Sequence, residues 1–187
     1  MTTGPDVSAP PKDYRLLVPR EWFRIDLGHD RWRRELKTFV DRQAEGKSVP
    51  AEVTQEAWTT LRNTAEAAVA KGALEFFLRP ELRDGSILPV SLVVSLIPTP
   101  GAPSPDQLFA SFDERERRKG TGAEVSAVVL PAGEAVRMRT GTTVDWYIHM
   151  PGSVGYLVLG FAVPLTGVDG AMGRLCTSIV ESLHWIM

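Results

Sequence analysis

One uncharged segment, 154–163 (VGYLVLGFAV), lies between Gly152 and Pro164 and is rich in β-branched and aromatic residues. A run of this kind without polar alternation predicts a strand that is buried on both faces in the middle of a sheet. After a loop that contains glycines, apolar residues recur every three or four positions: Met172, Leu175, Cys176, Ile179, Leu183 and Ile186. This spacing predicts a helix whose apolar stripe packs back on the sheet.

The chain before this strand has the pattern of two short strands followed by two helices. The strands are predicted at 14–19 and 22–27. Asp30 is expected to cap the first helix, which ends near Gly46. Pro50 suits a first-turn position of the second helix, whose apolar stripe is rich in alanine. Such a stripe indicates close packing on a neighbouring element.

In the middle of the chain, the spacing of apolar residues changes from that of helices to that of strands. Apolar runs at 74–78 and 87–97 flank the segment 83–86 (RDGS), which predicts a hairpin turn. Ser104 followed by Pro105 and Gln107 carries three agreeing signals of a helix start: a capping hydroxyl, a first-turn proline and a capping-box amide.

Three more strands are predicted at 125–130, 135–139 and 144–150, as an antiparallel meander that leads into the central strand. The fold class that follows is α+β, a mostly antiparallel sheet of about seven or eight strands with helices packed on it. We expect one domain over 14–187. The segment 1–13 is rich in Pro, Gly, Ser and Thr and is expected to be a disordered tail.

Composition narrows the range of functions. The 187 residues are 43% hydrophobic and 24% charged, which is typical of a globular domain. A net charge of −2 argues against general binding to nucleic acid or to anionic membranes. No apolar run approaches the roughly 20 residues of a membrane-spanning helix, and the first residues do not resemble a secretory signal. The single Cys176 excludes an internal disulfide, so we expect a cytoplasmic location.

Two motifs resemble known sites without matching them. Ser153 lies in PGSVG, one residue from the nucleophile-elbow pattern, but a strand follows it where the elbow needs a helix. We therefore interpret Ser153 as a hairpin residue. Gly167, Gly170 and Gly173 lie between a strand and a helix, where backbone N–H groups can hold a phosphate. Their spacing is neither that of a dinucleotide site nor that of a P-loop, and the structural alternative is that Gly173 allows close helix packing.

The histidines do not form a predicted site. His149 and Asp145 share a strand face, but four residues span roughly 13 Å, too far for a hydrogen-bonded pair. His29 and His184 lack the spacing of metal ligands. The sequence therefore predicts no catalytic residue, no metal ligand and no cofactor.

The basic and aromatic residues do not have the pattern of a nucleic-acid surface. Arg137 and Arg139 alternate on one strand face, and a second basic cluster ends a predicted helix at 115–118. Acidic residues are interleaved with both groups, which argues against nucleic-acid binding. Four tryptophans lie in or beside apolar stripes and are expected in the core: Trp22, Trp32, Trp58 and Trp185.

Three short segments carry a family resemblance: 18–22 (VPREW) with the strand after it, 157–164 (LVLGFAVP), and a closing helix at 178–185 (SIVESLHW). With these segments the chain resembles the Mog1/PsbP-like superfamily, including its small bacterial members. The resemblance implies an αβα sandwich that acts by binding. Members include a Ran-binding nuclear import factor, a photosystem subunit, bacterial lipoproteins and chaperones for secreted effectors, and no catalytic residues are carried over. Two consecutive helices between Asp30 and Gly72, and the lack of a lipoprotein signal, depart from this pattern.

Two functions follow as hypotheses. The first is a non-enzymatic, cytoplasmic protein-interaction module, an adaptor or chaperone-like protein that presents a sheet face or an edge strand such as 125–130 to a partner. Self-association into a homodimer through the same surface is part of this hypothesis. The alternative is a small-molecule or phosphate-binding protein, with or without enzymatic activity, that uses the Gly167–Gly173 loop. Arg137, Arg139 or His149 would supply the charge there.

Overall fold

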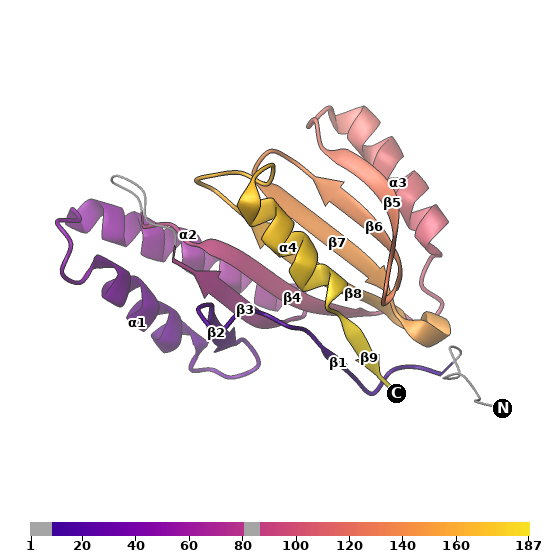
Figure 1. Cartoon of the computed structure of the whole chain (residues 1–187), viewed down its shortest axis with the longest axis horizontal. Helices are drawn as coiled ribbons and strands as arrows, with labels where there is room; N and C mark the ends of the chain where they lie inside the picture. Colours follow the sequence, from indigo (N-terminus) through magenta and orange to yellow (C-terminus); the bar gives the residue numbers. More distant parts are fainter. Residues whose placement is uncertain (1–8, 81–86) are drawn as a thin grey trace.

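The computed structural model describes residues 9–80 and 87–187 (Figure 1). Its main feature is an antiparallel sheet of seven strands. Across the sheet the strands follow the order β2 (Phe23–Asp26), β3 (Ala73–Arg79), β4 (Val90–Pro98), β8 (Gly155–Ala162), β7 (Thr143–His149), β6 (Gly133–Arg139) and β5 (Glu124–Leu130). The α+β class is therefore confirmed, as is the meander of the last three predicted strands. The predicted turn at 83–86 lies outside the described residues.

The predicted central strand, β8, lies in the middle of the sheet, between β4 and β7. Its Leu157, Leu159 and Phe161 are almost fully buried on one face. The alternate residues Val158 and Gly160 are only half-buried on the other face. The prediction of burial on both faces is therefore wrong for one of them, because the helices on that side do not cover the centre of the sheet.

On the fully buried face, α4 (Ala171–Glu181) packs across the sheet (Figure 1). Cys176 and Ile179 of this helix share one hydrophobic core with Leu159 and its neighbours on the central strands. The thiol of Cys176 is free and buried there, and burial raises its pKa to about 12. This thiol is therefore protonated and unreactive at neutral pH.

The chain leaves α4 earlier than the sequence predicts. The helix ends at Glu181, and residues His184–Ile186 form a short strand, β9, which pairs with β1 (Asp13–Arg15). The closing helix expected to reach Trp185 is therefore too long by one turn. Two tertiary contacts favour the strand: the pairing with β1, and a hydrogen bond of 2.8 Å from the Trp185 indole to the Ala132 carbonyl.

The same pairing changes the expectation for the start of the chain. The Lys12 N–H donates to the Ile186 carbonyl at 2.8 Å, and β1 begins at Asp13. Strand pairing thus starts inside the segment 1–13, which was expected to be a tail. It also ends at Arg15 rather than at residue 19, because β9 offers a partner of only three residues.

On the opposite face, α1 (Trp32–Ala44) and α2 (Ala51–Ala70) cover the β2 end of the sheet. They form a second core in which Leu36 and Leu61 pack with Phe76 of β3. Asp30 does not cap α1, since the helix begins after Arg31 without a side-chain cap. The Trp32 N–H donates instead to the His29 carbonyl at 3.2 Å.

The other end of this face is covered by α3 (Pro105–Lys119). Its predicted capping box is confirmed, with the Gln107 N–H donating to Ser104 Oγ at 3.3 Å and the Ser104 N–H to Gln107 Oε1 at 3.0 Å. The rings of Phe112 and Tyr147 pack edge to face, with their centroids 4.8 Å apart. Because α2 and α3 pack at opposite ends, the middle of this sheet face lies between them.

Candidate functional site

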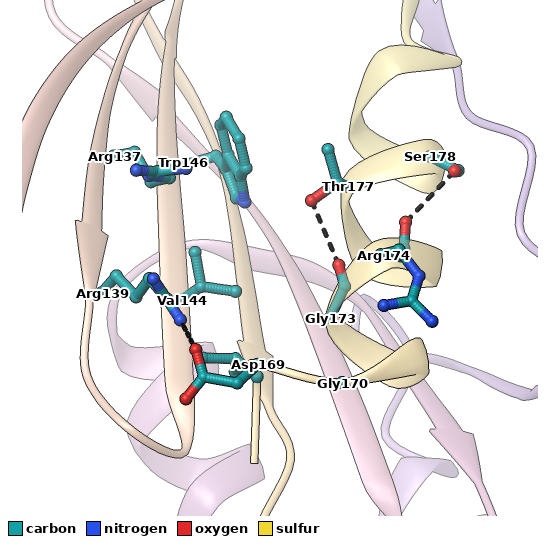
Figure 2. Close-up of a pocket in the computed structure, with 11 residues that line it drawn as sticks. Arg137, Arg139, Val144, Trp146, Asp169, Gly170, Gly173, Arg174, Thr177 and Ser178 are labelled. Atoms are coloured by element: carbon teal, nitrogen blue, oxygen red, sulfur yellow. Dashed lines mark hydrogen bonds and ion pairs between the residues drawn. The ribbon is translucent and has the colours of Figure 1, made fainter.

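A pocket of about 460 Å³ lies on the α4 face, between the first turns of this helix and strands β6 and β7 (Figure 2). We call it the arginine pocket. It is lined by Arg137, Arg139, Val144, Trp146, Val168, Asp169, Gly170, Gly173, Arg174, Thr177 and Ser178.

Strand alternation places the two β6 arginines in this pocket. Arg137 and Arg139 lie on the same face as the buried Ala135, which points toward α4. The register of β6 on β7 sets Arg137 opposite Trp146 and Arg139 opposite Val144. The guanidinium of Arg137 lies over the indole ring, with Cζ 5.6 Å from the ring centroid.

The glycine loop closes the pocket from the side of α4. Gly167 has a φ of +72°, and a side chain there would also come within 2.8 Å of the Gly141 carbonyl. At Gly173, a Cβ would lie 1.7 Å from the Val168 carbonyl oxygen. These two glycines are thus required by the backbone path, as the structural alternative predicted for Gly173. Gly170 is the N-cap of α4, and no side chain caps the helix.

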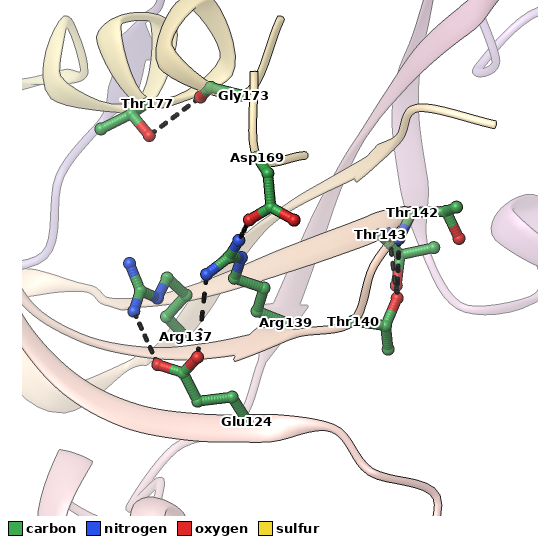
Figure 3. A network of polar contacts seen from close by, with 9 residues as sticks. All are labelled: Glu124, Arg137, Arg139, Thr140, Thr142, Thr143, Asp169, Gly173 and Thr177. Atoms are coloured by element: carbon green, nitrogen blue, oxygen red, sulfur yellow. Dashed lines mark hydrogen bonds and ion pairs between the residues drawn. The ribbon is translucent and has the colours of Figure 1, made fainter. Parts of the chain in front are cut away.

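A network of ion pairs joins β5, β6 and the loop (Figure 3). Arg137 donates to Glu124 Oε1 and to Ser126 Oγ, each at 3.2 Å. Arg139 approaches Glu124 at 3.8 Å and also pairs with Asp169 of the loop. The two arginine side chains are 28% and 31% exposed, while Asp169 is 82% exposed at the rim. Asp169 is therefore the partner that solvent or a ligand can most readily displace.

The charge of the pocket is positive. Three arginines line it against two carboxylates, that of Asp169 in the lining and that of Glu124, which pairs with Arg137 and Arg139 beside it. Arg174 is exposed on α4 and forms no ion pair within the part of the chain that the structure describes. The uncapped N-terminus of α4 adds partial positive charge, because the first N–H groups of a helix have no partner inside it.

One buried donor in the pocket wall has no acceptor. Trp146 is 4% exposed, and its Nε1 is buried without a hydrogen-bond partner within residues 9–80 and 87–187. Figure 2 shows this nitrogen on the side of the indole that faces α4. A buried N–H that lacks an acceptor destabilises the fold, so an oxygen atom that reached this nitrogen would be stabilised by it.

The two hydroxyl side chains of the pocket bond to the backbone of α4. The Thr177 hydroxyl donates to the Gly173 carbonyl and the Ser178 hydroxyl to the Arg174 carbonyl, each at 3.1 Å. Neither histidine nor cysteine is among the lining residues.

The structure brings together only some of the residues that the sequence singled out. Arg137 and Arg139 meet the glycine loop, as the small-molecule hypothesis requires. His149 does not, because it lies on the opposite sheet face with its ring 5.3 Å from that of Tyr156.

The remaining candidates lie elsewhere. Ser153 ends a single 3-10 turn (Pro151–Ser153) that leads into β8, so the interpretation as a hairpin residue is confirmed. His29 contacts Asp26 at 3.5 Å in an exposed turn. Within the described residues, no group of three or more potential metal ligands comes together. In the basic cluster of α3, Arg117 pairs with Asp113 at 2.5 Å on the helix surface.

Sequence reasoning missed a second cavity, on the opposite face of the sheet. This groove of about 470 Å³ has β4, β8 and β7 as its floor and α2 as one wall. Asp145 lies in it, and burial raises the pKa of its carboxyl, while the charge of Lys71 partly opposes that shift. The available signal was the alternation in β8, where Gly160 and Ala162 are too small to fill a core.

Comparison with known proteins adds no relative. No protein-family model, no curated protein and no solved structure gives a significant match to this chain. The resemblance to the Mog1/PsbP-like superfamily stays a prediction. In the described part of the chain, none of the helices has the length and apolar character needed to cross a membrane.

Proposed function

We propose that this protein is a non-enzymatic binding protein whose arginine pocket takes the anionic group of a small organic molecule. The observation that carries the proposal is the unpartnered Nε1 of the buried Trp146, which lies on the α4 side of the ring beside a pocket whose rim and walls hold three arginines. A carboxylate or phosphate oxygen would accept from this donor and from the guanidinium groups together.

The lining indicates the class of ligand. Guanidinium groups bind carboxylate and phosphate through two parallel hydrogen bonds, which fixes the orientation of the anion. Val144, Val168 and the Trp146 ring provide apolar wall beside these charges. A volume of about 460 Å³ is within the range of small-molecule sites and exceeds what a bare ion needs. The pocket is thus suited to an organic anion with a compact apolar body.

Binding would require a change of partner at Arg139. Its ion pair with Asp169 is exposed at the rim, and exposed pairs contribute only about 0–1 kcal/mol. A ligand anion that also contacts Arg137 and Trp146 can replace Asp169 at small cost. Removing the Asp169 charge should therefore strengthen binding.

The test is the melting temperature of the protein in phenyl phosphate, benzoate or inorganic phosphate at matched ionic strength. Ligand at 100 times its Kd adds about 2.7 kcal/mol to the stability of the folded state. We expect phenyl phosphate to raise the melting temperature most. Arg139→Gln should abolish this shift, and Asp169→Asn should enlarge it.

Arg33→Gln is the matched control, because Arg33 forms a surface ion pair with Glu66 far from the pocket. It should keep the full shift. Anions such as phosphate also stabilise proteins in general, and that contribution is common to all variants. Equal shifts in the wild type and in Arg139→Gln would therefore refute the proposal.

A second candidate function is the protein-interaction module that the resemblance implies, in the cytoplasm. One observation favours it: β5, the strand expected to receive a partner, lies at the edge of the sheet. An edge strand offers unpaired backbone groups to a second chain.

A further inference from the structure

The two edges of the seven-stranded sheet differ in how well they are protected. β2 has four residues, and two of them, Arg24 and Asp26, are charged. β5 has seven residues (EVSAVVL) with no proline and no lysine, and it pairs with β6 without a bulge. Short length, charge, proline and bulges are the usual means of preventing strands from pairing at an edge. β5 uses none of these four along most of its length, and although α3 packs on one face of it, Val129 stays exposed.

The hairpin that joins β5 to β6 determines which backbone groups face outward. Its two-residue turn places Leu130 opposite Gly133, so Leu130 bonds to β6. Hydrogen bonding alternates along an antiparallel strand. The N–H and C=O groups of Val125, Ala127 and Val129 therefore point away from β6. The Val129 side chain is 84% exposed, the highest value among the large hydrophobic side chains that the structure describes as exposed.

These outward residues are symmetric about Ala127. We propose that β5 pairs antiparallel with β5 of a second copy of this chain, with the two-fold axis at Ala127. In this register Ala127 faces Ala127 of the second copy, and Val125 faces Val129 of the second copy. Each outward residue then exchanges both backbone hydrogen bonds with an outward residue of the other strand. The partner is a second copy because the outward residues of one β5 strand pair in register with the outward residues of another β5 strand.

Side chains and charges agree with this register. The exposed Val129 is covered by a β-branched residue, which is a favourable cross-strand pair. The only charged residue of β5, Glu124, would face Leu130 of the second copy, so like charges do not meet. Its carboxylate is already bound to Arg137 at 3.2 Å. A two-fold axis is also the commonest symmetry of soluble homo-oligomers. The proposal rests on the interaction-module function and is independent of the arginine pocket.

The test is the native mass of the protein across a dilution series, compared with that of Ala127→Pro. Proline is tolerated on an edge strand where the N–H faces solvent, so the monomer should fold. In the dimer it removes the central hydrogen bonds. We expect the wild type to have twice the mass of one chain, and Ala127→Pro to have the mass of one chain. Amide exchange at Val125 and Val129 should become faster in the variant.

Val129→Lys provides a second route, since its exposed side chain can be changed without altering the monomer. It should also yield a single-chain mass, whereas Leu17→Lys, at another exposed apolar residue, should remain dimeric. A wild type that stays monomeric at its highest soluble concentration would overturn the proposal, as would a dimer that survives both β5 variants. If the protein purified from its own cells instead carries a different polypeptide that Ala127→Pro releases, self-pairing is wrong while the interaction function stands.

Discussion

The two faces of the central strands are built differently. On the α4 face, Leu157, Leu159 and Phe161 of β8 are almost completely buried in a core that continues into Cys176 and Ile179. On the other face, the same strands carry small or polar residues, and the helices stand at the two ends. There the floor of the groove is half-buried and holds Asp145.

This contrast indicates how stability and binding surface are divided in the molecule. The α4 face holds a continuous core, in which neighbouring atoms have little room to move. On the groove face, the same strands are less closely packed and more accessible to solvent. Substitutions at neighbouring positions on the two faces should therefore have unequal effects on the free energy of unfolding.

The largest difference is expected between two glycines. Gly173→Ala would place a Cβ 1.7 Å from the Val168 carbonyl oxygen, so backbone must move, and we expect a loss of about 3 kcal/mol. The better helix propensity of alanine, about 1 kcal/mol, does not offset this. In Gly160→Ala, the added Cβ would lie 2.8 Å from Asp145 Oδ1, which is the end of a side chain that can turn into the groove. We expect Gly160→Ala to lower the free energy of unfolding by less than about 1 kcal/mol. Urea denaturation measures both, and equal losses would contradict the contrast.

A smaller difference is expected between two adjacent valines of β4. Val94 is fully buried on the α4 face, whereas Val93 is partly buried at the groove. Val94→Ala loses about 0.8 kcal/mol for each carbon removed and leaves a cavity, which gives about 2–3 kcal/mol. Val93→Ala should cost about 1 kcal/mol or less because water already reaches it. Each variant is the matched control of the other in the same denaturation experiment.

The smallest effect is expected at Asp145. There the substitution should gain stability relative to the wild type as pH rises, whereas the substitutions above lose stability. Because burial raises the pKa of its carboxyl in the folded state, the native protein binds more protons than the unfolded chain. Wild-type stability therefore falls as pH rises from the ordinary carboxyl pKa through the raised one. Asp145→Asn removes this fall, so its stability relative to wild type should increase from pH 4 to pH 8. A constant difference across that range would mean that packing, not ionisation, is responsible.

Local signals were sufficient for much of the fold. The start of α3 is specified by Ser104, Pro105 and Gln107, which lie next to one another and need no distant partner. The central position of β8 follows from its own apolar composition. The end of α4 could not be predicted in this way, because residues 184–186 have the helical spacing yet pair with β1 at the other end of the chain.

The candidate site was predicted in part, because the small-molecule hypothesis placed Arg137, Arg139 or His149 at the glycine loop without deciding among them. Arg137, Arg139 and the glycine loop each stood out in the sequence, but so did His149. Which of them meet depends on the face of β6 and β7 that α4 covers. Trp146 lies within the predicted strand 144–150, but nothing in the sequence indicates that its indole N–H would lack an acceptor among the described residues.

By itself the sequence determined most of the elements, the α+β class, the meander and the central strand, because apolar periodicity and capping residues act over a few neighbouring positions. Only the tertiary structure decided which sheet face is closed, that the two ends of the chain pair, and that an arginine pocket and an unprotected edge strand result. These features depend on register and on helix placement between segments far apart in the chain, and many pairings satisfy the same local pattern.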